Sequence, residues 1–339
     1  MAQRAFITGL SGLKLTKEER AFLREARPWG LILFKRNVED KAQVTELVGE
    51  ALHELGAAAP VLVDQEGGRV QRLGPPNWPA YPPGAAYARI YSRDPGAGLA
   101  AARLGARLIA SDLLALGINV DCLPLADVPV RGADAVIGDR AYGDTPAQVA
   151  AIAQAVADGL ADGGVLPVLK HIPGHGRATA DSHMKLPVVD ASRSTLEVTD
   201  FAAFRPLKNL PLGMTAHVVF TALDPVLPAT TSATVIGEVI RRFIGFDGLL
   251  MSDDVSMGAL SGSIGERTRA SLAAGCDVVL HCNGKLDEMR QVAVQAPELA
   301  GEAARRAKAA LAARKPAADI DLAGARKEFA ALMQDESAA

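Results

Sequence analysis

The sequence has few cysteines and no long run of charge of one sign. Its three cysteines, Cys122, Cys276 and Cys282, are odd in number and follow no metal-ligand spacing, which favours reduced thiols in a cytoplasm over a disulfide framework. Thirty-six basic residues stand against 39 acidic ones, a formal net charge of -3, so we expect no nucleic-acid partner. Residues 1–20 hold only a short apolar stretch among basic residues, and we expect neither a signal peptide nor a membrane span.

Other signatures are missing as well. No Gly-x-Gly-x-x-Gly follows the first apolar run, which argues against dinucleotide binding. The sequence shows no repeat of fixed period and no low-complexity linker, although the proline-rich stretch Gly74–Pro95 predicts an irregular loop. With 49% apolar residues over 339 positions, the chain can bury a large core.

Short apolar runs alternate with helical stretches along the whole chain. Eight such runs occur, at 5–7, 31–34, 61–63, 120–123, 165–169, 212–215, 249–251 and 278–280. This alternation predicts a parallel sheet, and eight units in a chain of this length favour a closed (β/α)8 barrel. We expect residues 1–333 to form this single catalytic domain and residues 334–339 to be a disordered tail.

Two of the predicted helices begin at recognisable caps. Thr16 has Glu19 three residues on, and Thr145 is followed by Pro146 and then by Gln148 in the capping-box position. Both patterns predict a helix start at the threonine.

The most polar part of the chain follows the fifth apolar run. Lys170 and His171 stand directly after that run, and two more histidines, His175 and His183, follow within a dozen residues. Between residues 173 and about 192 there is no helical or strand periodicity, and a long connection of this kind is typical of a lid or a binding loop. We therefore expect this loop to take part in the chemistry.

The other predicted strands also end on polar residues, which a (β/α)8 barrel collects at one rim. They are Asp64, Asp127, His217, Asp253, Asp254, His281 and Asn283. Taken singly, an aspartate after a strand is often only the N-cap of the next helix, but several on one rim favour an active site. Asp64 also opens the segment that contains Glu66 and Arg69, where Arg69 is a candidate structural partner of Glu66.

The polar residues at the strand ends suit sugar recognition, because charged side chains form strong hydrogen bonds with hydroxyl groups. The candidates are Asp64, Arg72, Arg140 and Lys170, although Arg140 can also be interpreted as a solvated surface residue. We expect the head groups of Lys170 and Arg72 to face the cleft. Their loss should then leave no buried partner in the core and should reduce turnover without unfolding the barrel.

Cleavage of a glycosidic bond with retention needs a carboxylate below the anomeric carbon and a proton donor at the leaving oxygen. Asp253 or Asp254 supplies the carboxylate. His183 is a candidate donor if Asp181, two residues before it, orients its ring by a hydrogen bond. His175 competes for this role, although its place between two glycines favours a loop-shaping position.

Four ordered motifs together resemble one family. They are KHIPGHGRATADSHMKL (170–186), DQEGGRVQR (64–72), IGDRAYG (137–143) and MSDDVSMGA (251–259). The chain resembles the single-domain bacterial β-N-acetylhexosaminidases of glycoside hydrolase family 3 from the first strand to at least the eighth. The resemblance implies a cytoplasmic enzyme of peptidoglycan recycling that removes terminal non-reducing β-1,4-linked N-acetylglucosamine from muropeptides.

The resemblance also implies roles for single residues. Asp253 corresponds to the nucleophile, His183 to the general acid/base and Asp181 to its partner. The implied sugar ligands are Asp64, Arg72, Arg140, Lys170 and His171. We expect a monomer without metal or cofactor.

One departure and two rival functions remain. Arg177 stands where many relatives have an aspartate or a small residue, which bears on loop closure and on no assigned catalytic position. A metal-dependent amidohydrolase is the rival enzyme, but it needs a His-x-His pair at the first strand, and the segment 6–10 has none. A non-catalytic muropeptide-binding protein would keep the sugar ligands and lose the nucleophile or the Asp181–His183 pair.

Overall fold

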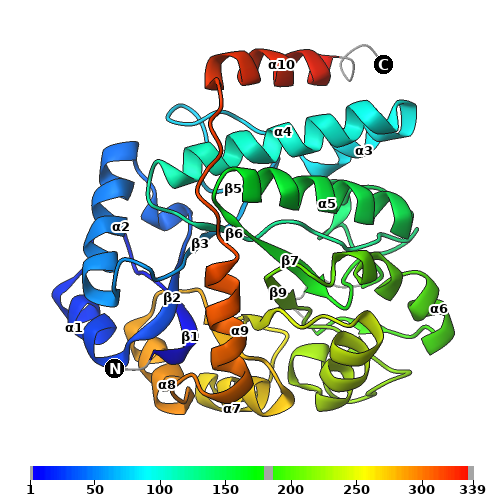
Figure 1. The fold of residues 1–339 in the computed structure, drawn as a ribbon. Helices are drawn as coiled ribbons and strands as arrows, with labels where there is room; N and C mark the ends of the chain where they lie inside the picture. Colours follow the sequence, from blue (N-terminus) through cyan, green and yellow to red (C-terminus); the bar gives the residue numbers. More distant parts are fainter. Residues whose placement is uncertain (1–2, 179–185, 335–339) are drawn as a thin grey trace.

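The computed structural model describes residues 3–178 and 186–334. Eight parallel strands close into a barrel in the order β1-β12-β11-β9-β7-β6-β3-β2 (Figure 1). These strands are β1 (Arg4–Gly9), β2 (Pro28–Leu33), β3 (Val61–Val63), β6 (Val120–Asp121), β7 (Leu166–Ile172), β9 (Leu212–Thr215), β11 (Leu249–Asp254) and β12 (Val278–His281). Each overlaps one of the eight apolar runs, so the predicted (β/α)8 barrel is confirmed.

Helices surround the barrel, and two small strand pairs lie outside it. The helices are α1 (Lys17–Ala26), α2 (Lys41–Leu55), α3 (Gly84–Arg93), α4 (Pro95–Leu114), α5 (Pro146–Asp162), α6 (Arg193–Val198), a π-type helix (Val235–Ile244), α7 (Ile264–Ala274), α8 (Leu286–Gln295), α9 (Gly301–Ala312) and α10 (Leu322–Gln334). The pairs are β4 (Gln65–Gly67) with β5 (Val70–Gln71), and β8 (Val188–Val189) with β10 (Val219–Phe220). Strand β8 is a short ordered piece of the connection predicted to lack periodicity.

The helix caps form as the sequence predicts, with one difference. The Thr16 side chain accepts the amide of Glu19, and the Glu19 carboxylate accepts the amide of Thr16 in return. Thr145 likewise caps α5 by accepting the Gln148 amide. The Gln148 side chain, however, donates to the carbonyl oxygen of Ala88 on α3, so this half of the predicted capping box is replaced by a tertiary contact.

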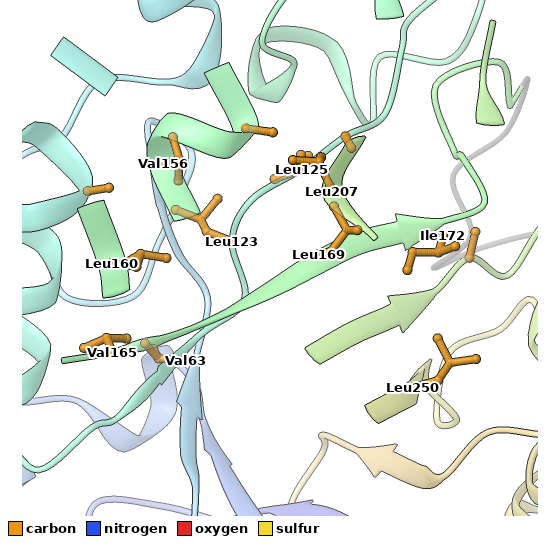
Figure 2. Packing of buried hydrophobic residues seen from close by; sticks show 14 of the residues in the cluster. Val63, Leu123, Leu125, Val156, Leu160, Val165, Leu169, Ile172, Leu207 and Leu250 are labelled. Carbon is orange, nitrogen blue, oxygen red and sulfur yellow. The ribbon is translucent and has the colours of Figure 1, made fainter. Parts of the chain in front are cut away.

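The strands separate two apolar layers by their side-chain alternation. On β7, Leu166 and Val168 belong to the cluster inside the barrel. The intervening Leu169 belongs to the outer cluster between the strands and the helices. Figure 2 shows the outer cluster around this strand, where Val156 and Leu160 of α5 belong to the same layer.

The sequence predicts an irregular loop over residues 74–95, but part of this stretch is helical. Residues Gly84–Arg93 form α3, and Pro83 stands at its N-cap. Five prolines of this stretch precede α3, and Pro95 is the first residue of α4, so none of them disturbs the hydrogen bonds inside a helix. Their high density therefore marks the ends of a helix and not a loop across the whole segment.

The last described helix, α10, packs against α4 on the outside of the barrel (Figure 1). It ends at Gln334, one residue beyond the predicted end of the domain, and residues 335–339 lie outside the described part of the chain. Among the helices of residues 3–178 and 186–334, none is long and apolar enough to cross a bilayer.

Candidate active site

The same alternation carries charged side chains into the top of the barrel. Because Leu166 and Val168 point inward, Lys170 follows on the same face of β7. Likewise Leu62 of β3 points inward, and Asp64 follows two residues later. The charged residues thus occupy the inward positions beyond the apolar layers, at the carboxyl ends of the strands, where barrel enzymes place their active sites.

A cavity of about 280 Å³ opens at this end of the barrel. Its lining includes six of the predicted site residues, namely Asp64, Arg72, Arg140, Lys170, His171 and Asp253. The other two, Asp181 and His183, lie outside the described residues. The volume is close to the lower end of the range of small-molecule sites, roughly 300–1,000 Å³.

Lys170 is the buried centre of a charged cluster. Its side chain is 2% exposed, and its Nζ lies 3.1 Å from Asp64 Oδ1 and 2.6 Å from Glu66 Oε1. Burial alone would lower the pKa of this ammonium, but the two carboxylates outweigh it and raise the pKa above its ordinary value. Lys170 is therefore held as a cation. The expectation that its loss would leave no buried partner is wrong, because both carboxylates lose a contact.

Two arginines complete the cluster from other segments. Arg72 Nη2 donates to Asp64 Oδ2 over 2.9 Å, and Arg140 donates to both oxygens of Glu66, each over 2.8 Å. Burial would raise the pKa values of both carboxyl groups, but Lys170 with these arginines lowers them. With its side chain 11% exposed and its head group paired, Arg140 is not a solvated surface residue.

Glu66 is a site residue that the sequence does not single out. Its predicted partner Arg69 instead pairs with Asp139 over 2.8 Å and donates to three carbonyl groups of the neighbouring loop. Glu66 stands two residues after Asp64 in an extended segment, so the two carboxylates face the same side. That spacing was the available signal.

Asp127 organises the two histidines at the start of the loop. Its Oδ2 lies 2.7 Å from Nδ1 of His171, and its Oδ1 accepts the backbone amide of His175 over 2.6 Å. Burial would raise the pKa of Asp127, but the imidazole of His171 lowers it, so Asp127 is an acceptor and His171 Nδ1 carries the proton. His171 therefore has its Nε2 left for other partners.

His175 is buried, with 3% of its surface exposed. Burial and the neighbouring His171 lower its pKa to about 4, against the opposing effect of Asp127 and Asp253. At neutral pH its ring is therefore uncharged.

The two consecutive aspartates at the end of β11 have different surroundings. Asp254 accepts the amides of Ser256 and Cys282 on Oδ1 over 2.9 and 3.0 Å, and the Ser256 hydroxyl on Oδ2 over 2.6 Å. Both of its oxygens are thus used to join the strand end to the following turn and to β12. Asp253 lines the cavity, and its Oδ1 accepts the Asp254 amide over 2.8 Å.

Arg177 lies at the border of the described loop. It donates through Nε and Nη2 to Asp200 Oδ2, both over 3.0 Å, and through Nη2 to the Thr199 hydroxyl over 3.2 Å. Its guanidinium thus ties residue 177 to the segment after α6 and is not part of the cavity lining.

The cavity is suited to binding a ligand with several hydroxyl groups beside the carboxylate of Asp253. Cations and carboxylates alternate along the ion-paired series that lines it, and such charged groups form strong hydrogen bonds with hydroxyl groups. The members of this series are Arg72, Asp64, Lys170, Glu66 and Arg140. In residues 3–178 and 186–334, no group of three or more His, Cys, Asp or Glu side chains is placed to hold a metal ion.

The sequence and the fold of the chain are similar to those of known proteins. Residues 3–311 match the glycosyl hydrolase family 3 N terminal domain. The beta-hexosaminidase of Alkalilimnicola ehrlichii is 43% identical over 281 residues, covering 81% of this chain and 79% of that protein. NagZ from Neisseria gonorrhoeae, solved in complex with zinc ion, has a TM-score of 0.85 at 32% identity, covering 98% of this chain and 99% of that one. Its complex with N-trifluoroacetyl-D-glucosamine has a TM-score of 0.83 with the same identity and coverage.

Proposed function

The chain belongs to glycosyl hydrolase family 3, and on that premise we propose that it is a retaining β-N-acetylhexosaminidase of cell-wall recycling. Its substrates are peptidoglycan fragments, from which it removes terminal non-reducing β-1,4-linked N-acetylglucosamine. The observation that carries the proposal is the cavity in which paired carboxylates and cations stand beside Asp253. Membership of this family makes the chain a glycoside hydrolase and decides against the amidohydrolase and the non-catalytic binding protein.

Asp253 is the proposed nucleophile. One of its carboxylate oxygens attacks the anomeric carbon while the glycosidic C–O bond breaks, giving a covalent glycosyl-enzyme that water then hydrolyses. Asp254 is the less suitable candidate because both of its oxygens already accept hydrogen bonds from the protein. Its role is to hold the turn that follows the nucleophile.

His183 is the proposed acid/base residue, with Asp181 as its partner. The leaving oxygen needs a proton in the first step, and the attacking water must lose one in the second. The alternative donor, His175, is buried and has a pKa of about 4, so at neutral pH it holds no second proton to give. This supports the assignment to His183.

The sugar is bound by the charged cluster and by His171. Lys170, Arg72 and Arg140 are donors and Asp64 is an acceptor, each already oriented by an ion pair. Preformed pairs of this kind present hydrogen-bonding atoms without first ordering a flexible side chain. His171 contributes Nε2, because its Nδ1 is engaged by Asp127.

We further propose that the enzyme works as a cytoplasmic monomer, uses no metal or cofactor, binds no nucleic acid, and forms its catalytic domain from residues 1–333. The zinc ion and the glucosamine derivative belong to the neisserial protein's structures.

The test is a comparison of two chromogenic substrates, an aryl N-acetyl-β-glucosaminide and the corresponding aryl β-glucoside. We expect hydrolysis of the first, with kcat/KM at least 100-fold above that for the second. Release of N-acetylglucosamine from a GlcNAc-anhydro-MurNAc peptide tests the natural aglycone. Absence of activity on the N-acetylated aryl substrate contradicts the proposal.

A further inference from the structure

Three buried polar side chains beside Asp253 have no part in the mechanism described so far. They are Thr215 at the end of β9, His217 two residues later, and Thr230 in the short helical turn Ala229–Thr231, and each is 0% exposed. Strand β9 pairs with β11, with Met214 opposite Met251. The pairing therefore places Thr215 alongside the end of β11, which holds the proposed nucleophile Asp253.

The hydrogens of this group can be assigned from its contacts. His217 Nε2 lies 3.0 Å from the carbonyl oxygen of Asp254. A carbonyl oxygen only accepts, so Nε2 carries a hydrogen. Its Nδ1 lies 2.7 Å from the Thr230 hydroxyl. With the ring hydrogen on Nε2, this nitrogen is an acceptor.

The two threonines complete one direction of donation. The Thr230 hydroxyl lies 2.7 Å from His217 Nδ1 and 3.1 Å from the carbonyl oxygen of Ala216, so its single hydrogen goes to the nearer nitrogen. The Thr230 oxygen then accepts the hydroxyl of Thr215 over 2.8 Å. The Thr215 oxygen in turn accepts the backbone amide of Asp253 over 3.3 Å.

The result is a relay that starts on the backbone of the proposed nucleophile and ends on that of the next residue. It runs from the Asp253 amide through Thr215, Thr230 and His217 to the Asp254 carbonyl. Between these two ends, the Asp254 amide donates to Asp253 Oδ1 over 2.8 Å. The Asp253 amide, the Asp254 amide and the Asp254 carbonyl are thus each engaged in a hydrogen bond.

We propose that His217, Thr230 and Thr215 are positioning residues that aim the Asp253 carboxylate at the anomeric carbon before the sugar arrives. The inference rests on the proposed function of Asp253. None of the three side chains lines the cavity among its described residues, so they act through the backbone and not on the sugar. Removing one relay hydroxyl should slow formation of the glycosyl-enzyme without weakening sugar binding, because an error of about 1 Å in a reacting group costs up to 100-fold in rate.

The test uses Thr230→Val, which keeps the shape of the side chain and removes the hydroxyl, beside Thr230→Ser, which keeps the hydroxyl. In Thr230→Val we expect kcat on the aryl N-acetyl-β-glucosaminide to fall about 10- to 100-fold, with the Kd for N-acetylglucosamine within twofold of wild type. Thr230→Ser should retain kcat within about threefold. Thr268→Val removes another fully buried threonine hydroxyl, one that donates to the Ile264 carbonyl in α7, and should hydrolyse at the wild-type rate.

Thr215→Val repeats the test from the other end of the relay if Thr230→Val fails to fold. Nitrogen NMR of the imidazoles should also show His217 in the Nε2–H form. Wild-type kcat in Thr230→Val or Thr215→Val, or an Nδ1–H ring at His217, overturns the inference. Equal losses in Thr230→Ser and Thr230→Val, with weaker N-acetylglucosamine binding in both, also overturn it, since they indicate a general packing role. If wild-type enzyme does not hydrolyse the substrate at all, the proposed function has failed instead.

Discussion

Replacing Lys170 by methionine should cost both stability and activity. The side chain is 2% exposed and its Nζ contacts Asp64 and Glu66 at 3.1 and 2.6 Å. Methionine keeps much of the length and apolar volume of lysine but no charge. The substitution therefore leaves two buried carboxylates with one cationic partner fewer, while the packing of the inner layer changes little.

The expected size follows from these contacts. Breaking a buried ion pair by removing one partner costs roughly 3–5 kcal/mol. Arg72 still pairs with Asp64 and Arg140 with Glu66, so we expect the lower end, about 3 kcal/mol. Unfolding entropy of about 2.1 cal/mol/K per residue converts this into a fall in Tm of about 4 °C for a chain of this length. A lost charged hydrogen bond to the sugar, worth about 1.5–3 kcal/mol, lowers kcat/KM by roughly 10- to 150-fold.

Two variants calibrate the measurement. Arg72→Met removes a cation whose side chain is 25% exposed, and it should lose activity with a fall in Tm of less than about 2 °C. Arg103→Met breaks an exposed pair with Asp162, whose partners are 55% and 41% exposed, and should change neither quantity. Calorimetry and hydrolysis of the aryl N-acetyl-β-glucosaminide give both readouts. A Lys170→Met protein with the wild-type Tm refutes the buried-cluster account.

Three further outcomes follow from the same site. The difference in unfolding free energy between wild type and Lys170→Met should be largest at pH 5–7 and should shrink below about pH 4. The reason is that Asp64 and Glu66 have lowered pKa values in the folded state and lose their contribution to stability as the pH falls through these values. Denaturant unfolding at each pH measures this difference, and a difference that grows in acid contradicts the prediction. His183→Ala should lower the rate of muropeptide cleavage far more than the rate at which an activated aryl glycoside forms the glycosyl-enzyme, and azide should restore turnover. Equal losses with both substrates, without rescue by azide, would move the acid/base role to His175. Activity should survive exhaustive chelation, and a loss reversed by zinc would favour metal chemistry.

Much of the fold was predictable because strands carry an apolar signal of their own. Each of the eight apolar runs became a barrel strand, and the period of two explains why Lys170 and Asp64 face the cavity. Helix α3 was missed because composition was averaged over residues 74–95, whereas prolines at a helix boundary have the opposite meaning from prolines inside one.

The partners inside the site were harder to predict. Arg69 is only three residues from Glu66, yet Glu66 pairs with Arg140, 74 positions away, and with Lys170. Likewise His217 was recognised as a polar strand end, but its link to Asp254 across 37 positions depends on the pairing of β9 with β11. Sequence indicates which side chains reach the rim, and only the closed barrel decides which of them meet.

The most direct test of the mechanism is to trap the glycosyl-enzyme and locate it. A fluorinated substrate analogue that forms the intermediate and hydrolyses slowly should add one sugar mass to the protein. Peptide mapping by mass spectrometry should place that mass on Asp253, and Asp253→Ala should neither be labelled nor retain hydrolysis. An adduct on Asp254 would contradict the account. So would wild-type enzyme that turns over the natural substrate but forms no adduct, because the acetamido oxygen of the sugar would then be attacking in place of Asp253.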